Sequence, residues 1–162
     1  MDRRSTSGGI ARSALAGVAL AGPVAGLVLL VGTQPVQAHE RRKTTVVIDL
    51  SAQRLRVFRS GQVVLATRVS AGSGRRYCVG GRCATATTPV GHFRVWRKVK
   101  AWHESLLGLM YKPIYFYRGY SIHGSLSVPH HPDSHGCVRV PIEVGEKLSA
   151  LLHVGDRVIV RR

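Results

Sequence analysis

One stretch of the chain, residues 123–139, combines residue types that together can perform nucleophilic chemistry. It reads HGSLSVPHHPDSHGCVR and holds four of the eight histidines together with Cys137. Thiolate chemistry needs a sulfur, a base that removes its proton, and backbone donors that hold the resulting oxyanion. The run Ser134-His135-Gly136-Cys137 offers a nucleophile on a tight, glycine-containing turn, and His123 lies upstream as a candidate base. The stretch therefore predicts a cysteine acyl-transferase site.

Other interpretations of Cys137 fit its surroundings less well. A solitary cysteine is on average a small buried hydrophobe, but Ser134, His135 and Gly136 are poor core neighbours. Cysteine and histidine are also zinc ligands, yet His131, His135 and Cys137 on one short loop match no standard zinc spacing. The chain contains no S-x-x-K, H-E-x-x-H or G-x-x-x-x-G-K-[ST] sequence. We therefore expect neither a metal nor another cofactor.

The two remaining cysteines, Cys78 and Cys83, bracket the flexible sequence Val-Gly-Gly-Arg. In an oxidising compartment this spacing favours a local disulfide. The alternative is half of a metal site, but the sequence has no second cysteine pair to complete one. Cys137 is then the odd cysteine of an exported chain, which indicates a reactive thiol or an intermolecular bridge.

The N-terminal residues are typical of an export signal. An uncharged apolar run over residues 14–32 follows three arginines, and Val36-Gln37-Ala38 provides a small-residue cleavage site. We predict a signal peptide over residues 1–38, with a retained membrane anchor as the alternative because the run approaches spanning length. In both cases the folded part lies outside the cytoplasm, in the periplasm or cell wall.

The chain is strongly basic, with 24 Lys and Arg against 8 Asp and Glu and a formal net charge of +16 over 162 residues. Removing residues 1–38 takes away three arginines and one aspartate, which leaves +14. Such a charge attracts polyanions. Export argues against nucleic acid as a partner and favours anionic polymers of the cell envelope. The alternative is that dispersed arginines simply keep a small domain soluble.

The elements that must position the reactive stretch are mostly β-strands. Residues 39–43 are expected to form a solvated linker, and residues 71–88, rich in Gly, Ser, Arg and Thr, a loop. Residues 98–112 are expected to be irregular. Apolar and β-branched patterning predicts strands over residues 44–50, 54–58, 62–70, 92–98 and 156–162, a Ser60-Gly61 hairpin turn, and two short strands around Arg118-Gly119.

One helix is predicted, over residues 141–152. Val144, Leu148, Leu151 and Leu152 fall on one face of it, Pro141 suits its first position and Gly155 lies just past its end. The chain has no internal repeat. The sequence thus predicts a single mostly-β domain over residues 44–162 with a small helix packed on it.

Residues 44–161 resemble the L,D-transpeptidase catalytic domain family, also called YkuD or ErfK. The resemblance rests on His123-Gly124 and on residues 134–139, which match the family's H-G and S-H-G-C-x-R signatures. Supporting matches are VIDLSAQRL at residues 47–55, TPVGHF at residues 88–93 and Gly155-Asp156. The family implies a β-sandwich or barrel with one short helix in its C-terminal half.

The resemblance also implies an enzyme that acts on peptidoglycan stem peptides, with donor and acceptor stems as its partners. Cys137 would attack the carbonyl between the L-centre of the third residue and a terminal D-alanine, which leaves. An amine of a neighbouring stem would resolve the thioester as a 3→3 cross-link. Water in place of the amine gives carboxypeptidase action. Carbapenems acylate this family's cysteine, and we expect a monomer.

Carried over residue by residue, the family assigns His123 as general base and acid and the Gly124 carbonyl as the group that orients its imidazole. Backbone N–H groups of Gly136 and Cys137 would form the oxyanion hole. His135 would shape the turn, although a role as base stays open. Ser134 and Arg139 are the candidate substrate-binding residues, Arg139 through a stem-peptide carboxylate.

Alternatives in other classes remain. A non-catalytic, basic wall-binding domain of the same fold is one, but an intact Cys137 and His123 count against it. Attachment of a protein or a D-amino acid to the wall is another outcome of the same chemistry. The cysteine pair at residues 78 and 83 is not a general feature of the family.

Overall fold

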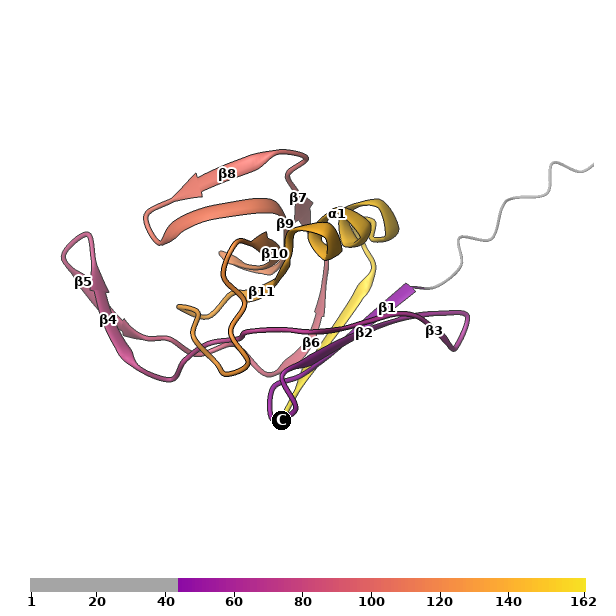
Figure 1. Cartoon of the computed structure of the whole chain (residues 1–162), viewed down its shortest axis with the longest axis horizontal. Helices are drawn as coiled ribbons and strands as arrows, with labels where there is room; N and C mark the ends of the chain where they lie inside the picture. The colour runs from indigo at the N-terminus through magenta and orange to yellow at the C-terminus, as the bar shows by residue number, and fades with distance from the viewer. Residues whose placement is uncertain (1–43) are drawn as a thin grey trace, which may run out of the picture. The chain divides into compact units, whose positions relative to one another are not determined.

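The computed structural model describes residues 44–162, in which two five-stranded sheets pack face to face (Figure 1). The predicted signal segment and linker, residues 1–43, lie outside the described residues. The first sheet has the order β3-β2-β1-β12-β6. Its strands are β1 (Thr44–Asp49), β2 (Arg54–Arg59), β3 (Gln62–Arg68), β6 (Gly91–Arg94) and β12 (Arg157–Arg161).

The predicted opening meander is confirmed, because β1 pairs antiparallel with β2 and β2 antiparallel with β3. Ser60 and Gly61 connect β2 and β3 with φ of 51° and 81°. Two consecutive positive-φ residues are typical of the type I′ turn that suits hairpin twist. The C-terminal strand β12 is inserted beside β1 in parallel, which the local pattern did not reveal.

The second sheet positions the reactive stretch. Its order is β11-β10-β9-β7, and β8 also pairs with β9. Its strands are β7 (Arg97–Lys98), β8 (Trp102–Ser105), β9 (Gly108–Tyr117), β10 (Tyr120–Ser125) and β11 (Val138–Pro141). The strands predicted around Arg118-Gly119 are therefore present, but β9 has ten residues and is not short.

Two segments differ from the sequence prediction. Residues 71–88 are not simply a loop, since β4 (Arg76–Val79) and β5 (Arg82–Thr85) form a separate two-stranded hairpin. Gly80 and Gly81, with φ of 56° and 74°, make its turn. Residues 98–112 are not irregular either, because most of them belong to the β8–β9 hairpin. Neither hairpin shows a continuous apolar alternation, so short exposed strands escape a pattern search.

Helix α1 (Ile142–Leu151) is the only helix among residues 44–162 and agrees with the prediction within one residue at each end. Pro141 is not its first helical residue as predicted. With ψ of 150° it is extended, since it ends β11, and it serves as N-cap. The face of α1 that carries Gly145 and Leu148 is buried against the second sheet.

The core lies between the sheets, as the alternating burial of β1, β2 and β12 requires. It consists of buried aliphatic side chains from both sheets and from α1, joined by Phe116. The sheets form a sandwich and do not close into a barrel, so the predicted mostly-β fold class is confirmed in its sandwich form. Among the described residues no helix is long and apolar enough to cross a bilayer.

Candidate active site

Strands β10 and β11, with Cys137 directly before β11, place four polar side chains on one face of the second sheet. The strands run parallel, with Ile122 opposite Val138 and His123 opposite Arg139. Because side chains alternate along a strand, Ser121 and His123 share a face, and so do Cys137 and Arg139. The sheet therefore brings the predicted nucleophile and base together although they are 14 positions apart in the sequence.

The nucleophile lies on a turn that only glycine allows. Gly136 has φ of 131°, and a Cβ there would lie 2.7 Å from the ring of Tyr120 and 3.0 Å from the Thr87 carbonyl oxygen. Ser134 Oγ accepts a hydrogen bond from the Gly136 N–H at 3.0 Å and donates to the Cys137 carbonyl. This side chain therefore holds the backbone of the turn on both sides of Gly136.

A second hydroxyl, from the segment between β5 and β6, fixes the same turn. Thr88 Oγ donates to the Gly136 carbonyl at 2.8 Å and accepts from the Gly72 N–H at 2.9 Å. Thr88 is buried. Thr88 begins the T-P-V-G sequence that supported the family resemblance. Its hydroxyl holds the backbone of the nucleophile turn, a role that the sequence alone did not assign.

The loop between β10 and β11, residues 126–137, which we call the site loop, is anchored by residues 70–73. Ser70 exchanges backbone hydrogen bonds with Arg139, and its hydroxyl donates to the His131 carbonyl at 2.9 Å. The Ala71 carbonyl accepts from the N–H groups of Asp133 and Ser134. These bonds make the site loop a fixed part of the domain despite its lack of regular structure.

His123 is oriented as the family resemblance predicts. Its Nδ1 lies 3.0 Å from the Gly124 carbonyl oxygen, a geometry in which Nδ1–H donates to that oxygen and Nε2 keeps its lone pair. The side chain is only 5% exposed. Burial, together with the positive charge of Arg139, lowers the pKa of His123 to about 4, against the opposing effect of the Gly124 hydrogen bond. The imidazole is therefore neutral at neutral pH and able to accept a proton.

A β-bulge lies directly opposite His123. Between the pairs Ile122–Ile114 and Gly124–Tyr111, β9 has two residues where β10 has one. One of the two, Lys112, has φ of 45°. Bulges re-aim side chains and are frequent beside active sites. Here the bulge interrupts the ladder at the strand position of the candidate base.

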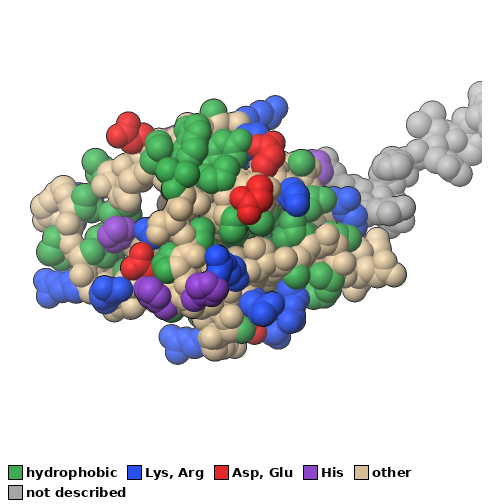
Figure 2. Space-filling model, viewed as in Figure 1, with side chains coloured by type: hydrophobic (Ala, Val, Ile, Leu, Met, Phe, Trp, Pro, Cys, Tyr) green, Lys and Arg blue, Asp and Glu red, His purple; other side chains and the backbone are tan. Residues whose placement is uncertain are grey.

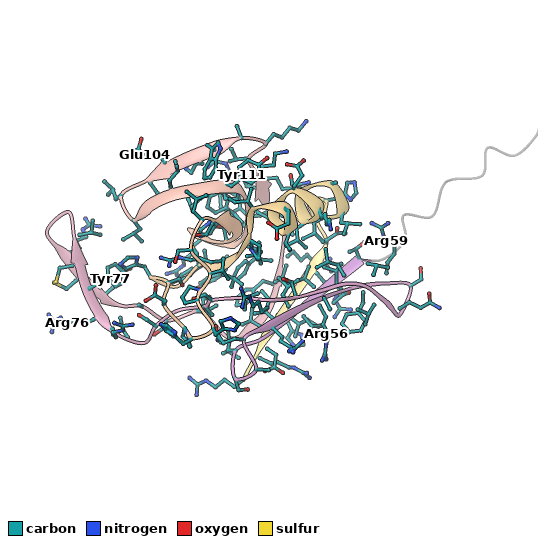
Figure 3. The ribbon with its side chains drawn as sticks, viewed as in Figure 1. Arg56, Arg59, Arg76, Tyr77, Glu104 and Tyr111 are labelled. Carbon is teal, nitrogen blue, oxygen red and sulfur yellow. A yellow bond between two sulfur atoms is a disulfide. The ribbon has the colours of Figure 1, made fainter. Side chains whose placement is uncertain are left out.

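Helix α1 packs against β10 at Gly124, the residue after His123. A Cβ on Gly145 would lie 2.9 Å from both the N and the Cα of Gly124, so the helix backbone touches the backbone of β10. Tyr111 and Lys112 of β9 bind Glu146 of the helix through contacts of 2.6 Å. Figure 3 shows Tyr111 between β9 and α1. The Gly124 carbonyl is thereby held in place from two sides.

The thiol of Cys137 has two polar neighbours. Ser121 Oγ lies 3.7 Å from Sγ, and the Gly119 carbonyl oxygen lies 3.9 Å from it. Ser121 is fully buried, and its hydroxyl also lies 3.7 Å from Met110 Sδ. Sequence reasoning missed Ser121, which no signature marks. The signal that could have found it is its place two residues before His123 on the same strand face.

His123 and Cys137 line one cleft, which has a volume of about 580 Å³. Arg139, Ser134 and His135 line it as well. Its remaining walls are largely apolar and come from the β8–β9 hairpin, from Val79 of β4 and from Leu126 of the site loop. The cleft is large enough for several residues of a peptide.

The β4–β5 hairpin forms one edge of this cleft. Cys78 and Cys83 sit opposite each other in its ladder and form the predicted disulfide. The Tyr77 ring packs edge-on against the His135 ring at 4.7 Å between centroids. Figure 3 shows Tyr77 on this hairpin. Through Tyr77 the disulfide-bearing hairpin contacts the residue two positions before Cys137.

Arg139 already has an acidic partner. Its Nη1 lies 3.2 Å from Asp133 Oδ2, while Arg75 Nη2 lies 3.4 Å from Asp133 Oδ1. Asp133 thus bridges two guanidinium groups at the cleft. A ligand carboxylate on Arg139 has to share it with Asp133.

Of the predicted site residues, the cleft is lined by His123, Ser134, His135, Cys137 and Arg139, whereas Gly124 and Gly136 adjoin these residues in the chain without lining it. Ser134 and Gly136 differ from their predicted roles in one respect, because the Ser134 hydroxyl and the Gly136 N–H are bonded to the turn itself. The N–H of Cys137 takes no part in these turn hydrogen bonds. No group of three or more His, Cys, Asp or Glu within residues 44–162 is arranged to hold a metal ion.

The comparisons with known proteins agree on one family. The family model of the L,D-transpeptidase catalytic domain (YkuD) matches residues 43–160. No match was found among curated proteins. An L,D-transpeptidase from Xylanimonas cellulosilytica is 40% identical with a TM-score of 0.71. The aligned region covers 74% of this chain and 61% of that one, so this chain spans less than two thirds of the solved structure.

Two further structures are similar at lower identity. An L,D-transpeptidase from Stackebrandtia nassauensis is 27% identical with a TM-score of 0.62, and covers 75% of this chain and 57% of its own. An L,D-transpeptidase in complex with imipenem is 20% identical with a TM-score of 0.61, and covers 74% of this chain and 59% of its own. The second likeness concerns the fold alone.

Proposed function

Because the chain belongs to the L,D-transpeptidase catalytic domain family, we propose that it is an exported cysteine acyltransferase that forms 3→3 cross-links between peptidoglycan stem peptides. The observation that carries the proposal is the arrangement of His123. Its Nδ1 is bound by the Gly124 carbonyl, and its side chain lines the same cleft as the Cys137 thiol.

In the first step the neutral His123 accepts the proton of the Cys137 thiol at Nε2. The thiolate attacks the carbonyl carbon between the third residue of the donor stem and its terminal D-alanine. The protonated imidazole then gives its proton to the D-alanine amine as the peptide bond breaks. A thioester on Cys137 and free D-alanine result.

In the second step an amine of the acceptor stem attacks the thioester. His123 takes the proton of that amine and returns it to the departing Cys137 sulfur, so the enzyme is regenerated. The Gly124 carbonyl orients the imidazole without placing a negative charge beside it. Since the buried site disfavours a permanent imidazolium, the proton is passed on in each half-reaction.

The Cys137 N–H is the oxyanion donor that the turn leaves available. The Gly136 N–H donates to Ser134 in this structure, so we assign Gly136 and Ser134 to holding the turn. His135 supports the turn through Tyr77 and lines the cleft. Arg139 faces the cleft, and we assign it the carboxylate of a stem peptide, shared with Asp133.

The wider setting follows from the same proposal. Residues 1–38 act as the export signal, and the domain works in the periplasm or cell wall as a monomer. Carbapenems are expected to acylate Cys137, in keeping with the similar fold solved with imipenem. Carboxypeptidase action and wall attachment use the same acyl-enzyme and differ only in the acceptor.

Product analysis with a purified disaccharide-tetrapeptide tests the proposal. The expected product is a dimer that has lost one D-alanine, with the cross-link between the two third residues located by fragmentation. The Cys137→Ala variant should form none. Release of a tripeptide without any dimer would assign carboxypeptidase action in place of cross-linking, and no product at all would favour a wall-binding domain.

A further inference from the structure

The outer face of the first sheet carries an unusual density of arginine. Six exposed arginines from four strands point away from the core, and we call this surface the arginine face. Their positions are Arg54 and Arg56 on β2, Arg68 on β3, Arg94 on β6, and Arg157 and Arg161 on β12. Figure 3 shows Arg56 below the sheet, whereas α1 lies above it.

The strand register places these side chains in rows. Arg54 pairs with Arg68 across β2 and β3, and Arg157 pairs with Arg94 across β12 and β6. Residues directly opposite in a sheet point to the same side. Positive charges thus lie roughly 7 Å apart along β2 and about 5 Å apart within each pair of strands, and β1, which has no arginine, separates the two pairs. Like charges directly opposite destabilise a sheet, so a stable fold keeps them here at a cost.

Only one carboxylate compensates this charge. Asp49 forms an ion pair with Arg161 at 3.2 Å, while Arg54, Arg56 and Arg157 have no acidic partner among the described residues. The glutamates of the described chain lie elsewhere, on β8 and α1. Figure 2 shows several blue side chains and little red along the lower edge, whereas red and blue side chains are mixed higher in the view.

The arginine face is shallow and continues toward the active site. Its hollow measures only about 20 Å³, too little to enclose a small ligand, and Asp49 lines it together with Arg54, Arg56 and Arg161. At one end Arg68 contacts the His130 ring of the site loop. The surface therefore fits an extended ligand that lies across the strands and ends beside the loop that carries Cys137.

We propose that the arginine face docks a flexible, linear phosphodiester polymer of the cell envelope. A guanidinium group donates two parallel hydrogen bonds to the oxygens of one phosphate. Arginine stays positively charged across the physiological pH range, as a phosphodiester stays negatively charged. A polymer with one phosphate per three-carbon repeat presents charges at a separation comparable to that of arginines along β2. A flat sheet has no helix or ribbon to enter a duplex groove, which disfavours double-stranded nucleic acid.

Binding of poly(glycerol phosphate) to the protein, followed by fluorescence anisotropy at several salt concentrations, tests this surface. The triple variant Arg54→Gln, Arg56→Gln, Arg157→Gln should bind at least about tenfold more weakly at roughly 0.1 M salt, with a flatter salt dependence. Within residues 44–162 these three exposed side chains form no hydrogen bond or ion pair, so the variant should fold normally.

A matched control removes the same charge elsewhere. Arg82→Gln, Lys100→Gln, Lys147→Gln changes exposed cations of β5, the β7–β8 connection and α1, and should retain binding within about twofold. If both variants lost polymer affinity equally, net charge alone would explain binding and the proposal would be overturned. Tighter binding of phosphatidylglycerol vesicles or duplex DNA through the same three arginines would overturn the choice of partner.

The docking surface does not use the chemistry of Cys137. The Cys137→Ala variant should bind the polymer as the unchanged protein does, and the arginine triple variant should process soluble stem peptides at the unchanged rate. If the unchanged protein binds the polymer but does not process stem peptides, the proposed enzymatic function fails and the docking proposal stands. If it processes stem peptides but the arginine triple variant binds the polymer as tightly as the unchanged protein, the docking proposal fails and the enzymatic function stands.

Discussion

At the scale of single residues, the thiol depends on a neighbour that no sequence signature marks. Ser121 is fully buried on the strand that carries His123, with its hydroxyl 3.7 Å from Cys137 Sγ. A hydroxyl in this position is able to stabilise the thiolate as the proton moves to His123. The strand face thus contributes a third side chain to the proposed pair.

We expect Ser121→Ala to slow acylation about fivefold, because the lost hydrogen bond is worth on the order of 1 kcal/mol. Stopped-flow fluorescence with a carbapenem measures the rate. Ser149→Ala, a change on α1 away from the cleft, is the control and should leave it unaltered. An unchanged rate in Ser121→Ala would show that this serine only fills space.

The sequence alone suffices to name the candidate residues of the site. His123, Gly124 and Cys137 could be named because their types carry the chemistry and their signatures are local. The bonds that hold them could not, since Thr88 reaches Gly136 across 48 positions and Gly145 reaches Gly124 through a helix contact. A linear pattern contains no information on such pairings until the sheet order is known.

At the scale of elements, the β4–β5 hairpin is a cleft edge that carries its own disulfide. Val79 lines the cleft and Tyr77 packs on His135, while the Cys78–Cys83 disulfide joins the two strands. A two-stranded hairpin alone is marginally stable in water. The disulfide therefore keeps the cleft edge formed when no substrate is bound.

We expect replacement of both hairpin cysteines by serine to raise the KM for the donor stem severalfold with a smaller effect on kcat, because a looser edge must be ordered on binding. Tyr77→Ala should act in the same direction, whereas Tyr77→Phe keeps the ring against His135 and should behave as the unchanged protein. Steady-state kinetics with soluble tetrapeptide measure the effect. An unaltered KM in the cysteine variant would remove the hairpin from substrate binding.

The elements also show where the pattern search succeeded and where it failed. The opening meander and α1 have apolar periodicities of 2 and 3.6 residues, and both were predicted nearly to the residue. The hairpin at residues 76–85 was missed, because residues 71–88 were predicted to be a loop. The hairpin at residues 102–117 was predicted only in part, as a short strand before Arg118. Strand β5 is exposed at all four residues and β8 alternates only weakly, so neither offers a buried face to detect.

At the scale of the whole molecule, a buried neutral histidine links catalysis to acid stability. The pKa of His123 is about 4 in the folded state and about 6.5 in an unfolded chain. Between pH 6.5 and pH 4 the unfolded chain binds a proton at this histidine and the folded protein does not. The free energy of unfolding therefore decreases as the pH is lowered through this window.

We expect the free energy of unfolding to fall by on the order of 3 kcal/mol between pH 6.5 and pH 4 through His123. Urea titrations at several pH values measure it. His123→Gln, which binds no proton there, should show a correspondingly flatter dependence over the same window. Parallel curves for the two proteins would contradict the buried, neutral state of His123.

The central claim, that Cys137 is a nucleophile activated by His123, is tested most directly by intact-protein mass spectrometry after incubation with imipenem. We predict a one-to-one adduct located on Cys137, absent in Cys137→Ala and formed far more slowly in His123→Ala. Cys78 and Cys83 should resist alkylation until reduced. A folded protein that forms no adduct while its Cys137 thiol is freely alkylated would contradict the account.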